Sequence, residues 1–162
     1  YAADRTTTES VVWTNLVNVT ASGGTLQKTA GCDGCPDAGA TSLQQIASGD
    51  GYFEFTAVET AALRVAGLSN LSAGTGAWEI AFAIRLQSGY AEVREAGVYR
   101  ESTAFGSGDT FRVSIESGRV EYARNGVVFY TSTAAPVYPL FVDTSLFDSG
   151  GTIVNAVIRR AP

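Results

Sequence analysis

The sequence predicts an all-β domain built from two stacked antiparallel sheets, and three observations lead to this fold class. Apolar side chains alternate with polar ones along several runs, as at Phe111, Val113 and Ile115, which is the period of a half-buried strand. Turn residues recur at short intervals, and Asn125-Gly126 is the strongest hairpin signal among them. No segment combines length with the periodicity of an amphipathic helix.

The alternation and the turn signals together define a series of short strands. A helical turn over residues 57–66 is the alternative to one of them, because Thr56-Ala57-Val58-Glu59 resembles a capping box. Many short antiparallel strands form two packed sheets, because each sheet buries its apolar face against the other. The strands are expected at residues 10–21, 24–29, 41–47, 51–57, 61–68, 78–86, 90–95, 97–101, 109–116, 119–124, 127–132, 138–143 and 152–160.

Composition limits the classes of partner that the chain is expected to have. The 162 residues, 45% of them hydrophobic, suffice for one domain with a sizeable core. The net charge of −5 argues against nucleic acid and anionic lipid, and no apolar run reaches the roughly 20 residues of a spanning helix. We expect a polar N-terminal arm at residues 1–9 and a single β-sandwich domain at residues 10–162, with no membrane insertion.

Two cysteines, Cys32 and Cys35, lie in a glycine-rich loop. A zinc site needs about four ligands, and the chain has no other cysteine and no histidine to supply them. The expected state is a short disulfide that clamps the loop in a secreted protein, with free thiols as the alternative. Loop acids such as Asp33 and Asp37 are read as solvated turn residues rather than calcium ligands, so no metal or other cofactor is expected.

Six segments follow one another along the chain: Val12–Asn15, Gly49–Thr56, Gly67–Ser69, Gly108–Val113, Tyr122–Gly126 and Phe129–Ser132. Together they resemble a bacterial SPRY-like module of the concanavalin A-like lectin/glucanase superfamily. This resemblance implies a jelly-roll sandwich of two curved antiparallel sheets, of the kind appended to secreted or surface proteins to bind glycans or protein partners. The loop at residues 32–36 departs from the pattern, so no ligand contact is carried over to it.

The superfamily also contains glycosidases, which need paired carboxyl groups. In the superfamily's glucanases, acids at alternate positions of one strand supply them. The nearest match here is residues 78–83, where Glu79 is followed on its face by Ala81 and Ala83. With no histidine, a Ser-His-Asp arrangement is also impossible. The sequence therefore predicts that the chain is not an enzyme.

Aromatic side chains near loops are the expected ligand contacts, because an aromatic ring stacks on the apolar face of a sugar. A tryptophan in a sandwich is nevertheless more often part of the core. Charged strand residues, among them Arg85, Glu92 and Arg94, are read as surface pairs across neighbouring strands. The predicted ligand-binding residues are Trp78, Tyr99, Phe105, Tyr52 and Tyr90.

Two hypotheses follow for the function. The first is a secreted, lectin-like binding module that recognises a glycan or a surface protein, extracellularly or at the cell surface. The second is a structural subunit of an extracellular filament, which self-associates through the arm at residues 1–9 or through edge strands.

Overall fold

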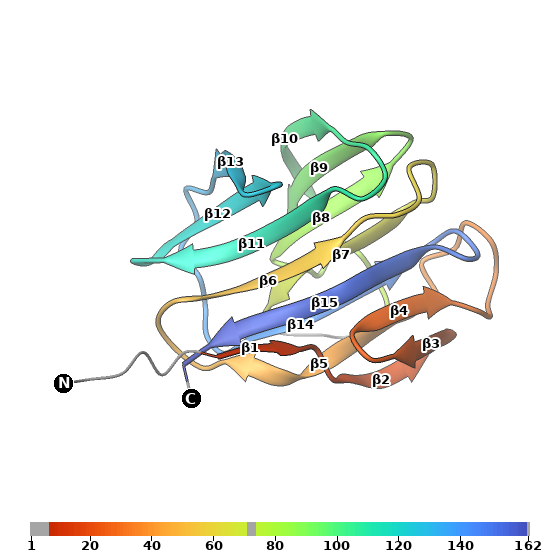
Figure 1. The fold of residues 1–162 in the computed structure, drawn as a ribbon, viewed down its shortest axis with the longest axis horizontal. Coiled ribbons are helices and arrows are strands. Elements are labelled where there is room, and N and C mark those ends of the chain that lie inside the picture. Colours follow the sequence, from red (N-terminus) through yellow and green to blue (C-terminus); the bar gives the residue numbers. More distant parts are fainter. Residues whose placement is uncertain (1–6, 71–73, 162) are drawn as a thin grey trace.

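The computed structural model describes residues 7–70 and 74–161, and these form two antiparallel sheets packed face to face (Figure 1). No helix occurs in these two ranges. The predicted all-β, two-sheet sandwich is therefore confirmed, and the alternative helical turn at residues 57–66 is wrong. That segment bends at residues 60–62 and then enters a strand.

The larger sheet contains eight strands. Seven of them follow the order β13-β12-β11-β6-β15-β4-β3, and β1 pairs with β15 on the same side as β4. The strands are β1 (Thr7–Ser10), β3 (Val19–Ser22), β4 (Thr25–Lys28), β6 (Gly51–Thr56), β11 (Thr110–Glu116), β12 (Arg119–Arg124), β13 (Val127–Thr131) and β15 (Thr152–Arg160).

The smaller sheet contains seven strands in the order β10-β9-β8-β7-β14-β5-β2. Its middle strands are joined to neighbours on both sides, whereas β10 and β2 form its two edges. The strands are β2 (Trp13–Val17), β5 (Gly39–Ile46), β7 (Arg64–Ser69), β8 (Phe82–Gln87), β9 (Tyr90–Glu95), β10 (Val98–Ala104) and β14 (Leu140–Leu146).

The core lies between the two sheets and contains the apolar side chains of the alternating runs. Phe111 and Val113 of β11 are fully buried, as are Phe53 and Phe55 of β6. The rings of Phe53 and Phe55 stack with centroids 5.4 Å apart, and Phe55 contacts Phe111 at 6.0 Å. Because the inner positions of β6 and β11 are apolar, the outer positions of these strands are left to define the surface chemistry of their sheet.

Two predicted strands differ from the structure for local reasons. The expected strand at residues 10–21 is divided among β1, β2 and β3. The break between β2 and β3 falls at Asn18, whose φ of 55° extended backbone does not allow, and Asn15, with the same φ, lies where the register of β2 with β5 shifts. The expected strand at residues 78–86 begins only at Phe82. The residues before it form turns, and Ile80 packs with Val65 on the outer face of the smaller sheet.

The N-terminal segment has a partner within its own chain. Residues 7–10 form β1, which pairs antiparallel with β15, and Arg160 Nε lies 2.8 Å from Glu9 Oε1. Residues 1–6 of the predicted arm lie outside the described residues. The boundary between arm and sandwich, and the filament hypothesis built on the arm, stay predictions.

Candidate functional site

The outer side of strands β8, β9 and β10 gathers exposed rings and charges. Tyr90, Glu92 and Arg94 alternate along β9 and point to this side, because the positions between them are buried. The strand register places Arg85 of β8 opposite Glu92, and Tyr99 of β10 opposite Arg94. We call this surface the aromatic face and define it as Trp78, Arg85, Tyr90, Glu92, Arg94 and Tyr99.

A hydrogen-bonded network joins the charged members of the aromatic face. Glu92 Oε1 accepts from Arg94 Nη2 at 2.8 Å, from Arg94 Nε at 3.1 Å and from Arg85 Nη1 at 3.2 Å. Arg85 Nη2 donates to Gln87 Oε1 at 2.8 Å. These charge-assisted bonds hold two planar guanidinium groups against the sheet, which fixes the direction of their polar atoms.

Two aromatic rings stand next to Arg94. Trp78 is 63% exposed and lies against Gly97 in the turn between β9 and β10, whose carbonyl accepts from Arg94 Nη1 at 3.2 Å. The Tyr99 ring covers the Arg94 guanidinium at 5.4 Å, and its hydroxyl donates to Ser102 Oγ at 3.1 Å. A guanidinium that stacks on a ring and bonds to carbonyl and carboxylate oxygens is held in place, so both rings are presented with defined positions.

The segment before β8 explains why the Trp78 indole is exposed. Ala77 and Ile80, on either side of it, are buried and pack with Val65 and Ala83 on the outer face of the smaller sheet. Ser69 Oγ donates to the carbonyl of Glu79 at 3.2 Å. These contacts anchor the turn on both sides of Trp78. The Trp78 side chain therefore extends away from the sandwich from a backbone that is held in place.

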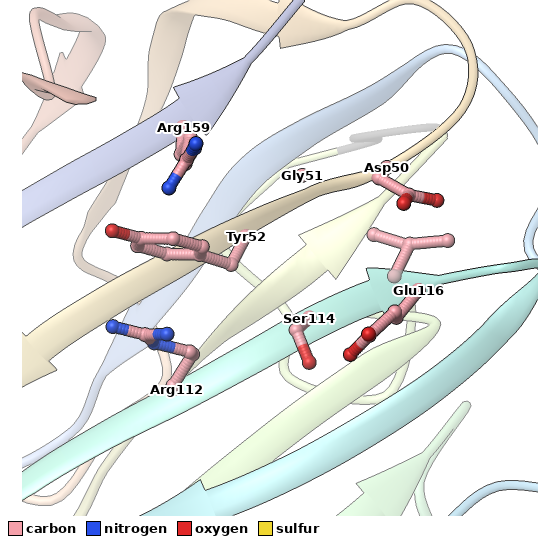
Figure 2. A pocket seen from close by; sticks show the side chains of 8 residues that line it. Asp50, Gly51, Tyr52, Arg112, Ser114, Glu116 and Arg159 are labelled. Atoms are coloured by element: carbon pink, nitrogen blue, oxygen red, sulfur yellow. The ribbon is translucent and has the colours of Figure 1, made fainter. Parts of the chain in front are cut away.

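Tyr52 lies on the other sheet, in a hollow of about 370 Å³ whose residues Figure 2 shows. The Arg112 guanidinium lies 3.8 Å from the Tyr52 ring centroid, and its Nε bonds to Glu54 Oε1 at 3.1 Å. Arg159 lies on the opposite side of the ring (Figure 2). Since a cation covers one side of the ring and a second borders the other, Tyr52 offers less free ring surface than Trp78.

The structure places Phe105 in the core, although the sequence singled it out as a ligand contact. Its side chain is only 7% exposed and meets the Phe111 ring edge-on at 5.7 Å. Tyr90, in contrast, is exposed at the opposite end of β9 from Tyr99. The structure thus brings Trp78, Tyr90 and Tyr99 to one face and separates them from Tyr52 and Phe105.

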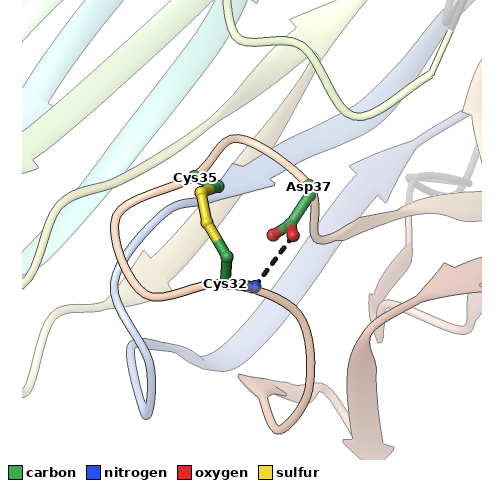
Figure 3. Close-up of side chains that lie close together, drawn as sticks. All are labelled: Cys32, Cys35 and Asp37. Carbon is green, nitrogen blue, oxygen red and sulfur yellow. Dashed lines mark hydrogen bonds between the residues drawn. A yellow bond between two sulfur atoms is a disulfide. The ribbon is translucent and has the colours of Figure 1, made fainter.

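Cys32 and Cys35 form a disulfide, in the loop where the sequence placed one (Figure 3). Asp37 lies beside it and accepts from the Cys32 amide at 2.9 Å. These three side chains are close enough together to suggest a metal site, but a disulfide provides no thiolate for a metal. A hydrogen bond from Lys28 lowers the pKa of Asp37 below its ordinary value, helped by the Cys32 amide.

Sequence reasoning missed the polar half of the aromatic face. The sequence predicts only surface pairing for Arg85, Glu92 and Arg94, because each one resembles a solvated strand residue when it is taken alone. Their alternation in β8 and β9 was the available signal. It required the strand register, which aligns Arg85 with Glu92, to show that they converge.

Solved structures of the same architecture confirm the predicted concanavalin A-like/SPRY-like sandwich. The carbohydrate recognition domain of Emp46p has a TM-score of 0.63 at 12% identity, over 95% of this chain and 87% of that one. The SPRY domain of human HERC1 has a TM-score of 0.58 at 11% identity, over 93% and 92%. The Bacillus licheniformis β-glucanase has a TM-score of 0.56 at 11% identity, over 100% and 94%. No protein-family model and no curated protein matches the sequence.

The prediction that the chain is not an enzyme is wrong as an inference from this fold. Besides the glucanase, an alginate lyase of polysaccharide lyase family 7 shares the architecture, with a TM-score of 0.55 at 12% identity. The match covers 76% of this chain and 65% of the lyase. The expected alternation of Glu79, Ala81 and Ala83 along one strand does not occur either, because β8 begins at Phe82. Fold and identity at this level do not establish catalysis either.

The described residues contain no helix of the length and hydropathy needed to cross a membrane.

Proposed function

We propose that this domain binds carbohydrate through the aromatic face, and that it works outside the reducing cytosol. The observation on which the proposal rests is the Trp78 indole, 63% exposed and anchored beside the Arg94–Glu92 pair. An exposed indole stacks on the apolar C–H face of a sugar ring, while fixed polar atoms nearby bond to its hydroxyls.

The dimensions of the face suit an extended chain rather than a single sugar. Tyr90 and Arg94 are on the same side of β9 and four residues apart, which corresponds to about 13 Å along a strand. Exposed rings therefore occur near both ends of this strand, with the guanidinium–carboxylate network between them. A polysaccharide lying along β9 would contact Tyr90 at one end and Trp78 and Tyr99 at the other.

Two further observations support the proposal. The Emp46p domain, which has the same architecture, is a carbohydrate recognition domain. The Cys32–Cys35 disulfide is the kind of bond that persists in oxidising compartments, which favours a secreted or cell-surface location.

The test is binding to a panel of soluble polysaccharides, measured by affinity electrophoresis and calorimetry, with the reaction mixtures also assayed for cleavage products. Trp78→Ala and Tyr99→Ala should each weaken binding about tenfold or more, as loss of a central aromatic contact does. Leu43→Ala is the matched control, since Leu43 is 67% exposed on β5 of the same sheet but outside the aromatic face. Full binding by Trp78→Ala, or equal loss in the control, would refute the proposal.

A further inference from the structure

A second pocket opens at one end of the smaller sheet, beside Ala81 and Phe82 at the start of β8. At this end β7 and β9 finish and β8, β10 and β14 begin, as the antiparallel order requires. The chain segment between β13 and β14 contributes Ala134 and Val137 to the wall. The pocket has a volume of about 280 Å³ and, apart from Asn70, Glu95 and Arg100, an apolar lining.

A buried carboxylate forms the polar part of this pocket. Glu95 is only 6% exposed, and its Oε2 accepts from the hydroxyl of Tyr122 at 2.9 Å. Tyr122 is completely buried, so the protein fixes the carboxylate from behind. Glu95 Oε1 is buried as well, yet within the described part of the chain it has no hydrogen-bond partner. A buried carboxylate oxygen without a donor is rare and calls for an explanation.

The charge of Glu95 is balanced by a cation that can be exchanged. Arg100 Nε lies 3.3 Å from Glu95 Oε1, but the Arg100 side chain is 42% exposed and comes from the edge strand β10. Such a side chain can move into solvent at little cost, because water solvates its guanidinium. The carboxylate cannot follow, since its own strand and Tyr122 hold it inside.

We propose that this end pocket binds a guanidinium or ammonium group carried on a short apolar stem, the chemistry of an arginine or lysine side chain. The cation replaces Arg100 beside Glu95 Oε1 and donates the hydrogen bond that this oxygen lacks. The stem packs against Phe82, Val137 and Leu140. Once Arg100 has moved into solvent, the buried carboxylate favours a cationic partner over a neutral one, because its charge is then uncompensated. Arg100 is then an internal competitor for the site.

The experiment is an NMR titration of the amide resonances with butylguanidinium chloride, compared with butanol in sodium chloride of equal ionic strength. Butylguanidinium should perturb the amides of Ala96, Ala134 and Val137 and bind about tenfold more tightly than butanol. Equal affinity for the two probes, or perturbations elsewhere only, would overturn the proposal.

Two variants make the test specific. Arg100→Gln removes the competitor and should tighten butylguanidinium binding about fivefold, whereas weaker binding by this variant would contradict the proposal even if other variants fail to fold. Glu95→Gln should abolish the preference for butylguanidinium over butanol. Trp78→Ala should leave the affinities for butylguanidinium and butanol unchanged, because Trp78 does not line the end pocket.

The source of the cation is distinguished by a third probe, the tripeptide acetyl-Gly-Arg-Gly-amide. Tighter binding than butylguanidinium would support the proposed chemistry with a polypeptide as the source. Equal or weaker binding, still above that of butanol, would support it with a free small cation. Binding no better than butanol by either cationic probe would refute it.

Discussion

Lys28 Nζ lies 2.7 Å from Asp37 Oδ1, and this ion pair forms the centre of a cage of four oxygens. The ammonium also donates to the carbonyls of Cys32 at 2.6 Å, Phe147 at 2.7 Å and Cys35 at 3.0 Å. Lys28, the only lysine of the chain, is 2% exposed. One ammonium thus connects the end of β4, the disulfide loop and the segment that follows β14.

Lys28→Met should destabilise the domain by about 3–5 kcal/mol, because it leaves carbonyls and a carboxylate around an apolar side chain. Urea unfolding at neutral pH measures this change. Arg119→Met is the matched control, since Arg119 is an exposed cation at the start of β12. A loss as small as in the control would show that the cage contributes little to stability. The double variant Lys28→Met/Asp37→Asn should be less destabilised than Lys28→Met alone.

The disulfide closes a small loop, so its contribution should be modest. Cys35 follows Cys32 at a sequence separation of 3, and the chain-entropy model gives a stabilisation of about 2 kcal/mol for such a loop. The variant Cys32→Ser/Cys35→Ser should lose that amount in urea unfolding under non-reducing conditions. Adding reductant should lower the stability of the native chain to that of the variant and leave the variant unchanged. A reductant effect on the variant would assign the change to another cause.

The sandwich could be predicted from the sequence because it depends on local rules. Alternation and turn chemistry predicted most strands, and the Asn125-Gly126 hairpin joins β12 to β13 as expected. The cage around Lys28 could not be predicted, since Phe147 is far from the lysine in sequence and only the packing brings its carbonyl close. The same applies to the aromatic face, where strand register brings Arg85 to Glu92. Single residues such as Phe105 give no local signal that separates core from surface.

Protonation of the Asp109 carboxylate should make the domain less stable in acid. The amide of Gly106, the Asn125 side chain and the Arg124 guanidinium all bond to its carboxylate and lower its pKa to about 2. Because the folded state has the lower pKa, the stabilisation is complete above the unfolded value of about 4 and is lost as the pH falls through about 2.

The matching variant is Asp109→Asn. Allowing for solvent screening, it should cost about 1 kcal/mol at neutral pH. The difference between native and variant in urea unfolding should shrink as the pH is lowered from about 6 to about 2, since the native carboxylate then becomes protonated. A difference that does not change over this range would contradict the assignment of the pKa to Asp109.

Phe105→Ala should affect folding rather than ligand binding. The side chain is 7% exposed and its ring contacts Phe111, so its removal leaves a cavity that costs about 3–5 kcal/mol. Thermal unfolding measures the loss. Polysaccharide binding, measured well below the lowered melting temperature, should equal that of the native chain. Weakened binding by the folded variant would return Phe105 to the ligand contacts that the sequence suggested.

Gly97→Ala should test the position of Trp78 without changing the tryptophan itself. Gly97 has φ of 84°, and a Cβ added there would lie 3.0 Å from Trp78 Cε3, closer than most Cβ contacts in proteins. The indole must therefore shift, and polysaccharide binding should weaken together with a change in tryptophan fluorescence. Gly118→Ala is the control for backbone strain alone, because Gly118 has φ of 78° and nothing within 4 Å of such a Cβ. Both variants should lose about 1 kcal/mol of stability, but only Gly97→Ala should lose binding. Equal binding by the two variants would mean that the exact placement of the indole against the turn does not matter to the ligand.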